Sequence, residues 1–309
     1  MPSNLNPLGA LPARFRRQRL LIVGCGDVGL RVAAALPRRV RVLALTSTPA
    51  RHAELRARGI VPLSGNLDQP ASLQRLAGLA DRVLHLAPPP GEGPGDPRTR
   101  DLLRALRRRA PPRALVYGST SGVYGDCRGA WVQETRAPQA ATARGQRRVQ
   151  AERHVRFHGR STGVRSAILR IPGIYAPDRE GGTPRDRLLR GTPVLRAEDD
   201  VHTNHIHADD LARACLAALW RGAPQRVYHV NDDTQLKMGD YFDQAARLYG
   251  LPPPKRISRQ EAREQLSPML LSFMSESRRM DNTRLKRELR LKLRYPTVAE
   301  GLRENSGQR

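Results

Sequence analysis

Lysine is nearly absent from this chain. Only four of its 54 basic residues are lysines (Lys237, Lys255, Lys286 and Lys292), and against 29 acidic residues the formal net charge is +25. The arginines are spread from Arg14 to Arg309 among abundant alanine, proline and glycine, which indicates a compositional bias more than a patch built for nucleic acid. Aromatic residues make up 4% of the chain, which leaves few rings for stacking on bases. We therefore favour a solvated basic surface and keep nucleic-acid binding as a weaker alternative.

Cysteine and long apolar runs are also scarce. Three cysteines, odd in number and widely spaced, fit neither a disulfide framework nor a zinc site, and this usage is typical of a reducing cytoplasm. No apolar run approaches the ~18 residues of a membrane span, and residues 1–18 lack the apolar core of a signal peptide. We expect a cytoplasmic protein without membrane association, in which residues 1–18 form a disordered lead-in.

The strongest motif lies near the N-terminus. The apolar run 20–23 leads into Gly24-Cys25-Gly26-Asp27-Val28-Gly29 and then into an alanine-rich helical segment. A strand, a glycine loop and a helix in this order are typical of dinucleotide binding, with the pyrophosphate at the positive end of the helix. Gly24 should make the tight turn, Gly26 should let the backbone approach the pyrophosphate, and Gly29 should let the helix pack closely on the strand.

Predicted strands and helices alternate along most of the chain. Apolar runs predict strands at 40–45, 60–63, 81–87, 113–118, 163–170 and 225–230, and helical patterns fall at 49–58, 98–109, 144–158 and 209–220. This alternation predicts an α/β protein with a Rossmann-type doubly wound parallel sheet. Residues 19–172 and 202–231 should form the dinucleotide-binding domain. Residues 173–201 and 232–309, which show no clear strand runs, should form a smaller substrate lobe, with the substrate in the cleft between the two.

Four further segments, in order, carry a resemblance to a known family. They are STSGVYG at 119–125, RIPGIYAP at 170–177, HIHADDLARACLAAL at 205–219 and VYHVNDD at 227–233. Together with the glycine loop they resemble the extended short-chain dehydrogenase/reductase superfamily, of the NAD-dependent epimerase/dehydratase type, from about residue 20 to residue 303. The resemblance implies a Rossmann sheet with a small C-terminal substrate lobe, an NAD(P) cofactor, a small-molecule substrate and the homodimers that are common in this family.

The resemblance also implies roles for individual residues. It places Asn66 and Leu67 beside the adenine, and Ala87 against the cofactor at the end of the fourth strand. It gives Thr120 the place of the Ser/Thr that hydrogen-bonds the reacting oxygen. It places Pro172-Gly173 beside the nicotinamide.

The usual catalytic dyad of this family, Tyr-x-x-x-Lys, is missing. Alignment on Ala151-Glu152 puts Arg144 at the tyrosine position and Arg148 at the lysine position, and no lysine precedes Lys237. Arginine stays protonated at working pH, so it can bind an anion or stabilise an oxyanion but cannot act as a general base. The sequence therefore predicts an atypical member. Tyr124 is an alternative acid, although a packed tyrosine is the interpretation we favour.

The end of the second predicted strand bears on the choice of cofactor. An acid there accepts hydrogen bonds from the ribose 2′-hydroxyl of NAD, whereas an arginine accommodates the 2′-phosphate of NADP. Here Thr46-Ser47-Thr48 is followed by Arg51, and no acid precedes Glu54. We therefore expect NADP to be favoured over NAD. The alternative is that Thr46, Ser47 and Thr48 only cap the next helix.

The substrate is less well defined. Sugar-nucleotide epimerases often carry an arginine for the diphosphate where this chain has Thr203-Asn204. An arginine from elsewhere could take its place, with these candidates: Arg165, Arg185, Arg187 and Arg196.

A cluster of metal-ligand residue types lies at 202–210, where His202, His205 and His207 precede Asp209 and Asp210. We interpret it as a strand-to-helix junction and expect no metal, with Asp209 or Asp210 capping a helix that begins at Leu211.

Taken together, these features predict an NAD(P)-binding oxidoreductase or epimerase-type enzyme that acts on an unidentified small alcohol, carbonyl or sugar-like substrate. The alternative is a non-catalytic dinucleotide-binding protein that senses redox state or scaffolds a partner.

Overall fold

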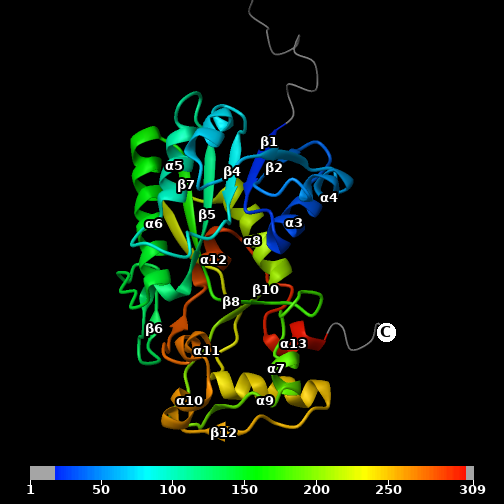
Figure 1. Cartoon of the computed structure of the whole chain (residues 1–309), viewed down its shortest axis with the longest axis vertical. Coiled ribbons are helices and arrows are strands. Elements are labelled where there is room, and N and C mark those ends of the chain that lie inside the picture. The colour runs from blue at the N-terminus through cyan, green and yellow to red at the C-terminus, as the bar shows by residue number, and fades with distance from the viewer. Residues whose placement is uncertain (1–17, 304–309) are drawn as a thin grey trace, which may run out of the picture.

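A seven-stranded parallel sheet lies at the centre of the computed structural model, which describes residues 18–303 (Figure 1). The predicted lead-in therefore lies outside the described residues, apart from Gln18. The strand order is β11-β7-β5-β4-β1-β2-β3, so the chain adds strands to one side of β1 and then to the other. This order is the Rossmann-type doubly wound sheet that the sequence predicts.

The elements of this domain follow the predicted alternation. Its strands are β1 (Arg19–Val23), β2 (Arg41–Thr46), β3 (Val61–Ser64), β4 (Arg82–His85), β5 (Ala114–Thr120), β7 (Arg165–Ile171) and β11 (Arg226–His229). Its helices are α3 (Asp27–Ala34), α4 (Arg51–Ala57), η1 (Pro70–Leu76), α5 (Pro97–Leu106), η2 (Ser121–Tyr124), α6 (Ala143–Thr162) and α8 (Ala208–Arg221). Each strand and helix that the sequence predicts for this domain is present close to its expected bounds, while the 3₁₀ helices η1 and η2 were not predicted.

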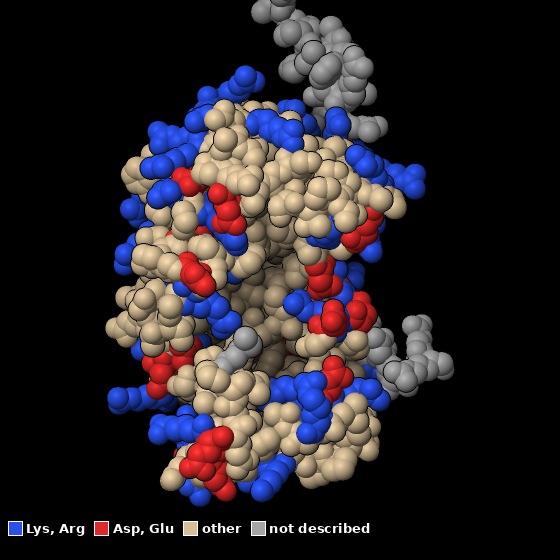
Figure 2. Space-filling model, in the orientation of Figure 1, with Lys and Arg blue, Asp and Glu red and all other residues tan. Residues whose placement is uncertain are grey.

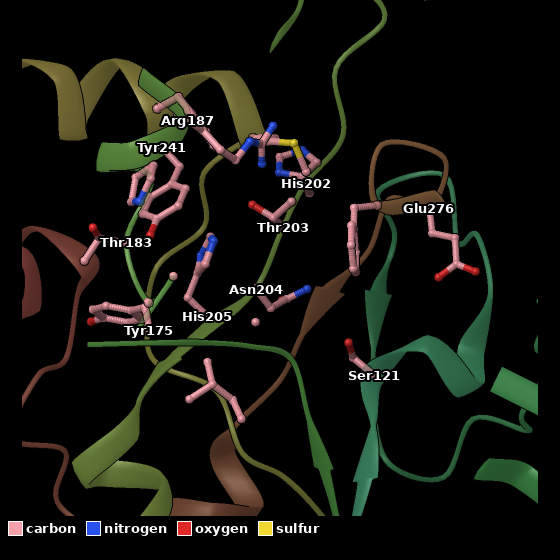
Figure 3. Close-up of a pocket in the computed structure, with 18 of the residues that line it drawn as sticks. Ser121, Tyr175, Thr183, Arg187, His202, Thr203, Asn204, His205, Tyr241 and Glu276 are labelled. Carbon is pink, nitrogen blue, oxygen red and sulfur yellow. The ribbon is translucent and has the colours of Figure 1, made fainter. Parts of the chain in front are cut away.

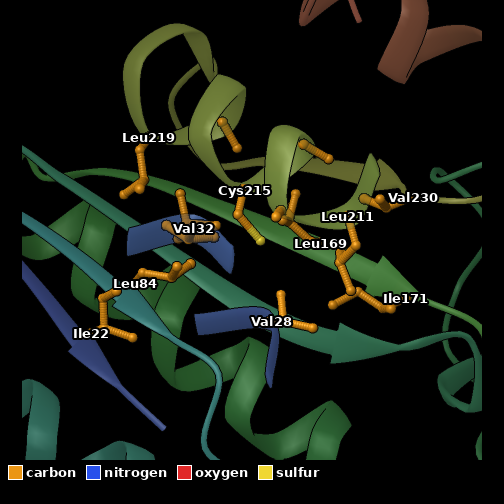
Figure 4. Close-up of a cluster of buried hydrophobic side chains, with 14 of the residues drawn as sticks. Ile22, Val28, Val32, Leu84, Leu169, Ile171, Leu211, Cys215, Leu219 and Val230 are labelled. Carbon is orange, nitrogen blue, oxygen red and sulfur yellow. The ribbon is translucent and has the colours of Figure 1, made fainter. Parts of the chain in front are cut away.

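The sheet is buried on both faces because successive strand residues point to opposite sides. In β1, Leu20 and Ile22 pack with helices α3 and α8, whereas Leu21 and Val23 pack with α5 and α6 on the other face. Figure 4 shows the first of these two clusters, in which side chains of α3 and α8 meet over the strands. Burial of each such leucine or isoleucine contributes about 1.5–3 kcal/mol, so the alternating pattern of the strands fixes which helices cover which face.

The remaining elements are short except for the twelve-residue helix α9, and most of them lie below the sheet in the view of Figure 1. They are β6 (Trp131–Val132), β8 (Gly173–Tyr175), α7 (Arg185–Leu189), β9 (Val194–Leu195), β10 (His205–His207), α9 (Met238–Tyr249), β12 (Arg256–Ile257), α10 (Arg259–Gln265), α11 (Pro268–Phe273), β13 (Arg279–Met280), α12 (Thr283–Glu288) and α13 (Val298–Arg303). The expectation that 173–201 and 232–309 lack strands was wrong, because β8, β9, β12 and β13 lie there and pair as β10-β8, β12-β9 and β13-β6. Strands of two or three residues are too short to show a period-two pattern.

These short elements have a buried cluster of their own. Tyr175, Leu195 and Phe242 belong to it, and all of its members come from 173–201 and 232–309. Helix α12 departs from this arrangement, because Leu285 and Leu289 pack into the cluster between the sheet and helices α3 and α8. The chain thus returns to the central sheet before it ends.

Helix α8 begins earlier than the sequence predicts. It starts at Ala208, and its N-cap is His207, whose Nδ1 accepts a hydrogen bond from the backbone N–H of Asp209 at 3.2 Å. The prediction that Asp209 or Asp210 caps a helix from Leu211 was therefore wrong. The buried carboxylate of Asp210 accepts backbone N–H groups from the segment before α13 instead.

The histidines of this junction take part in ring stacks. The ring of His205 faces that of Tyr241, with centroids 4.2 Å apart, and the ring of His207 faces that of Tyr295 at 3.8 Å. Within residues 18–303, no three His, Cys, Asp or Glu side chains are grouped as a metal site. Over the same part of the chain, no helix combines the length and apolarity that crossing a membrane requires.

Candidate cofactor and substrate site

The three glycines of the loop after β1 meet three different surroundings. Gly24 has φ +85°, and a Cβ there would lie 2.3 Å from the backbone nitrogen of Ala87, so only glycine fits against the end of β4. A Cβ on Gly29 would lie 3.3 Å from the Ile22 side chain, which keeps α3 close to β1. A Cβ on Gly26 would have no atom within 4 Å. Gly26 alone therefore faces open space.

This open space belongs to a cavity of about 310 Å³, which we call the cofactor groove. The residues that line it include Gly24, Gly26, Asp27, Val28, Gly29, Gly118, Thr120, Arg148, Pro172 and Arg179. Gly26 is the N-cap of α3 and provides no side-chain cap for the helix. A side chain at position 26 would fill this groove. Because the groove lies at the positive end of a helix, it fits a pyrophosphate.

The carboxylate of Asp27 accepts hydrogen bonds from two arginines. Arg31 donates to it from Nε at 3.0 Å, and Arg179 donates from Nη1 at 3.2 Å. Arg31 also donates to the carboxylates of Asp178 and Asp209. Asp27 therefore holds Arg179 at the edge of the groove, a role that the glycine motif does not reveal.

The residues expected to distinguish NADP from NAD lie beside the glycine loop. Arg51 donates from Nη1 to the backbone oxygen of Cys25 at 2.9 Å, so its guanidinium is fixed against the loop. Thr46 Oγ1 accepts the N–H of Thr48 at 3.2 Å, and Ser47 is exposed. The end of β2 thus presents hydroxyl groups and one arginine.

The residues assigned to the adenine lie in the loop after β3. Asn66 Oδ1 accepts the N–H of Asp68 at 2.9 Å, which shapes this loop, and Leu67 packs against the apolar cluster beneath α5. Ala87 follows β4, is 8% exposed and donates its N–H to Val23 O at 3.0 Å. The contact of Asn66 and Leu67 with an adenine, and that of Ala87 with the cofactor, stay predictions.

A second cavity of about 320 Å³ adjoins the cofactor groove and shares Thr120, Arg148 and Pro172 with it. We call it the middle cavity. Thr120 Oγ1 accepts the N–H of Gly122 at 3.2 Å, so its own hydrogen is available to another acceptor. Gly173 also lines the middle cavity, where β8 begins.

The two arginines at the dyad positions both line the middle cavity. Arg148 donates from Nη1 to Gly118 O at 2.6 Å and to the Tyr117 hydroxyl at 3.0 Å, which fixes it at the carboxyl end of β5. Arg144 is exposed, with its guanidinium carbon 5.2 Å from the centre of the Phe273 ring. Helix α6 therefore presents two positive groups at the middle cavity, and their correspondence to the tyrosine and lysine of the dyad stays a prediction.

Tyr124 lies away from these cavities. It is 1% exposed, and its hydroxyl contacts His229 and Arg170 in the core. Burial raises its pKa to about 12, so it holds its proton at neutral pH. This placement agrees with the packed tyrosine that we favour from the sequence, and it disagrees with the alternative of Tyr124 as the acid, because the hydroxyl is held in the core.

A third cavity of about 280 Å³ lies farther from the sheet, and we call it the lower cavity. It shares Ser121, Gly173, Phe273, Glu276 and Arg278 with the middle cavity, so the three cavities lie side by side. Figure 2 shows the hollow in the face of the molecule between the sheet domain and the short elements below it. In Figure 3, Glu276 and Ser121 lie on one side of the lower cavity, and Tyr175, Thr183 and Tyr241 lie on the other.

One of the four arginines proposed for the substrate lines the lower cavity. Arg187 of α7 reaches it, with its guanidinium carbon 4.3 Å from the centre of the Phe242 ring. Arg165 donates to a backbone oxygen of α8, Arg196 pairs with Glu198 and Asp199 at the surface, and Arg185 is exposed. The structure therefore selects Arg187 among the candidates.

Sequence reasoning missed Glu276. It is the one carboxylate among the residues lining the middle and lower cavities, and its Oε2 accepts two hydrogen bonds from Arg278, at 3.0 and 2.6 Å. A Cβ built on Gly122 would lie 3.6 Å from Thr120 Oγ1 and 4.0 Å from Glu276 Oε2, so the two side chains flank the same glycine. No pattern in the loop between α11 and β13 marks this residue, because its position depends on tertiary contacts.

The model of the NAD-dependent epimerase/dehydratase family matches residues 20–231 of the chain. The chain belongs to this family. The matched segment contains the glycine loop, Thr120, both dyad positions and Pro172-Gly173. The description of the family names NAD dependence, which agrees with the groove at the end of α3.

Comparison with individual proteins shows a shared fold and sequence similarity, but it does not identify the reaction. A protein of unknown function from Silicibacter pomeroyi DSS is 31% identical, with a TM-score of 0.77 over 93% of this chain and 97% of that one. Protein YeeZ of Escherichia coli K12 is 28% identical over 180 residues, which are 57% of this chain and 62% of YeeZ. UDP-glucuronic acid 4-epimerase from Bacillus cereus, solved in complex with NAD, shares the fold with a TM-score of 0.73, covering 93% of this chain and 96% of that one, at 19% identity.

Proposed function

We propose that the chain is an NADP-dependent oxidoreductase or epimerase-type enzyme that acts on a small alcohol, carbonyl or sugar-like substrate. One observation carries the proposal. The groove beside Gly26 runs past Thr120 and Arg148 and continues into the middle and lower cavities, so a cofactor and a small molecule have room end to end. The bound cofactor would supply hydride transfer, and the protein supplies binding, orientation and proton transfer.

The residues around the middle cavity divide these tasks. Thr120 donates its free hydroxyl hydrogen to the reacting oxygen, since its lone pair already accepts the N–H of Gly122. Arg148, fixed by Gly118 O and Tyr117, places a permanent positive charge near the groove, which stabilises an anion or a developing oxyanion. Arg144 adds a second positive charge at the mouth, and Pro172-Gly173 form the wall where the groove and the middle cavity meet.

Glu276 takes over the proton transfer that the missing tyrosine performs elsewhere in the family. Arginine cannot exchange a proton at working pH, so a different group is required. Arg278 fixes one oxygen of the carboxylate, while Oε1 has no hydrogen-bond partner among residues 18–303. The carboxylate is thus oriented toward the cavity with an oxygen available to accept a proton.

The alternative function is a non-catalytic dinucleotide-binding protein, and the absent Tyr-x-x-x-Lys dyad favours it. Loading the purified protein with NADPH and screening small alcohols, carbonyls and sugars for a change in NADPH absorbance separates the two. Turnover of any of these compounds supports the enzyme. Tight cofactor binding without turnover of any compound supports the non-catalytic protein.

NADP should bind at least about tenfold more tightly than NAD, since a charged hydrogen bond to a phosphate is worth about 1.5–3 kcal/mol. The reason is the absence of an acid at the end of β2 and the position of Arg51 against the loop. Thermal shifts at matched ligand concentrations measure the preference.

Arg51→Ala should bring the two affinities together by weakening NADP alone. Arg56→Ala is the matched control, because Arg56 is exposed on the same helix. A larger shift with NAD than with NADP in the unaltered protein would show that the assignment of Arg51 is wrong.

Glu276→Gln should slow turnover of a substrate found in the screen by about 10²- to 10⁴-fold, the usual contribution of a positioned proton-transfer group. Steady-state rates measure the effect. Glu264→Gln, an exposed position on α10, is the control. A rate in Glu276→Gln equal to that of the unaltered protein would assign the proton transfer to another group.

A further inference from the structure

The lower cavity collects buried polar atoms that have no hydrogen-bond partner within the described part of the chain. They are Arg187 Nε and Nη2, His202 Nδ1, Thr203 Oγ1 and His205 Nδ1, together with Glu276 Oε1 and Arg278 Nε of the ion pair shared with the middle cavity. Figure 3 shows the side chains of Arg187, His202, Thr203 and His205 around one space, although they come from α7, from the segment before β10 and from β10 itself. Buried polar groups in folded proteins are almost always satisfied, so several unpaired ones in one cavity indicate a ligand that satisfies them.

The charge of this cavity is positive. Burial lowers the pKa of Arg187, and the neighbouring charge of Arg190 lowers it further. Within residues 18–303, no aspartate or glutamate forms an ion pair with its guanidinium. Glu276, the one carboxylate lining the cavity, is already paired with Arg278. Burial also lowers the pKa of His205 to about 4, so this imidazole is neutral at pH 7. Arg187 therefore carries one uncompensated positive charge.

Several other half-buried or buried arginines are paired with acids. Arg170 is held by Glu152, Arg256 by Asp243, and Arg31 by three aspartates. A buried charge without a counter-ion is costly, and a fold that keeps one recovers that cost when an anion binds. Arg187 differs from these arginines in that its partner is missing from the protein.

The cavity also limits the size of its ligand. Its volume of about 280 Å³ lies at the lower end of small-molecule sites. The rings of Tyr241 and Phe242 form part of its wall. Ser121 and Glu276 belong to both the lower and the middle cavity, so a compact molecule held at Arg187 can extend toward Thr120.

We propose that the lower cavity binds the substrate through one carboxylate or phosphate group, which pairs with Arg187 and with the polar atoms of His202, Thr203 and His205. The substrate is then a compact anionic hydroxy or keto compound, with its anionic end at α7 and its reacting carbon toward Thr120. The identification of the bound anion as the substrate rests on the proposed function, whereas the anion site itself does not depend on any cofactor.

Titration calorimetry with two probes, glycolate and inorganic phosphate, tests the proposal on the full chain at constant ionic strength, with and without NADPH. We expect at least one probe to bind, and Arg187→Met to weaken that binding by at least about tenfold, as expected for loss of a charged hydrogen bond. Arg190→Met, an exposed arginine three residues away, should leave binding nearly unchanged. Binding of glycolate alone assigns a carboxylate substrate, binding of phosphate alone assigns a phosphomonoester, and binding of both assigns a site for either group.

The melting temperature without ligand distinguishes an anion-binding arginine from a structural one. Because Arg187 has no counter-ion, Arg187→Met should melt at the same temperature as the unaltered protein or higher, whereas loss of a structural arginine would lower it. If Arg187→Met fails to fold, Arg187→Gln removes the charge and keeps a polar group. The affinity of Arg187→Gln for the two anions then decides whether Arg187 binds them. Absence of binding by both probes, or equal affinities in the unaltered protein and the variant, would overturn the anion site. Anion binding without NADPH binding would overturn the proposed function and leave the anion site standing.

Discussion

Replacing Gly26 with valine is expected to abolish cofactor binding while leaving the fold intact. A Cβ at this position meets no protein atom within 4 Å, and the backbone there is extended, with φ −85° and ψ −153°. The added side chain therefore enters the space at the end of α3 where a pyrophosphate fits. We expect at least about a 100-fold loss of NADPH affinity, which corresponds to about 2.8 kcal/mol. The free energy of unfolding without ligand should change by less than about 1 kcal/mol.

Gly24→Ala is the matched variant for this experiment, because the two glycines have opposite surroundings. A Cβ on Gly24 would lie 2.3 Å from Ala87 N, at φ +85°, so alanine there should destabilise the protein whether or not cofactor is present. NADPH fluorescence and thermal melting of both variants separate the two effects. NADPH binding by Gly26→Val at the affinity of the unaltered protein would remove the groove as the pyrophosphate site.

Arg170→Met should lower the free energy of unfolding by about 3–5 kcal/mol, the usual cost of leaving one member of a buried ion pair alone. Arg170 is 1% exposed and donates to both carboxylate oxygens of Glu152, from Nε at 3.0 Å and from Nη2 at 2.7 Å. Glu152 also accepts the Ser119 hydroxyl at 2.7 Å, so the pair connects α6 with β5 and β7 beneath the middle cavity. Urea unfolding measures the change.

The double variant Arg170→Met with Glu152→Leu controls for loss of packing. It removes both charges and should recover part of the lost stability, because no unpaired carboxylate remains in the core. A single variant that costs less than about 1 kcal/mol would show that water reaches Glu152 and that the pair does not organise the core.

The central domain was predictable because its strands and helices carry their own patterns. In β1, alternate residues belong to apolar clusters on opposite faces of the sheet, and the glycine loop follows directly. The local sequence therefore predicts both the strand and the cofactor-binding role of the loop after it. Gly24 and Gly29 have the close contacts that their roles require. The sequence left the role of Tyr124 open between a packed tyrosine, which it favoured, and an acid, and the structure places this side chain in the core while Thr120 lines a cavity.

The lower cavity was not predictable for a different reason. Arg187 belongs to a helix of five residues, and Glu276 lies in a loop, so neither element has enough length to show a period. Their convergence depends on contacts between segments about ninety positions apart. The sequence offered Arg187 only as one of four arginines, and it gave no reason to consider Glu276.

The return of α12 to the sheet has a consequence for the order in which the protein can fold as it is synthesised. Leu285, Leu289, Leu291 and Leu293 help to fill the core between the sheet and α8. A ribosome releases the N-terminal part of a chain first, and domains generally fold as units in that order. Here the sheet and helix α8 lack part of their core until residue 293 has emerged. These leucines therefore couple the completion of the core around the sheet to the synthesis of the segment that follows β11.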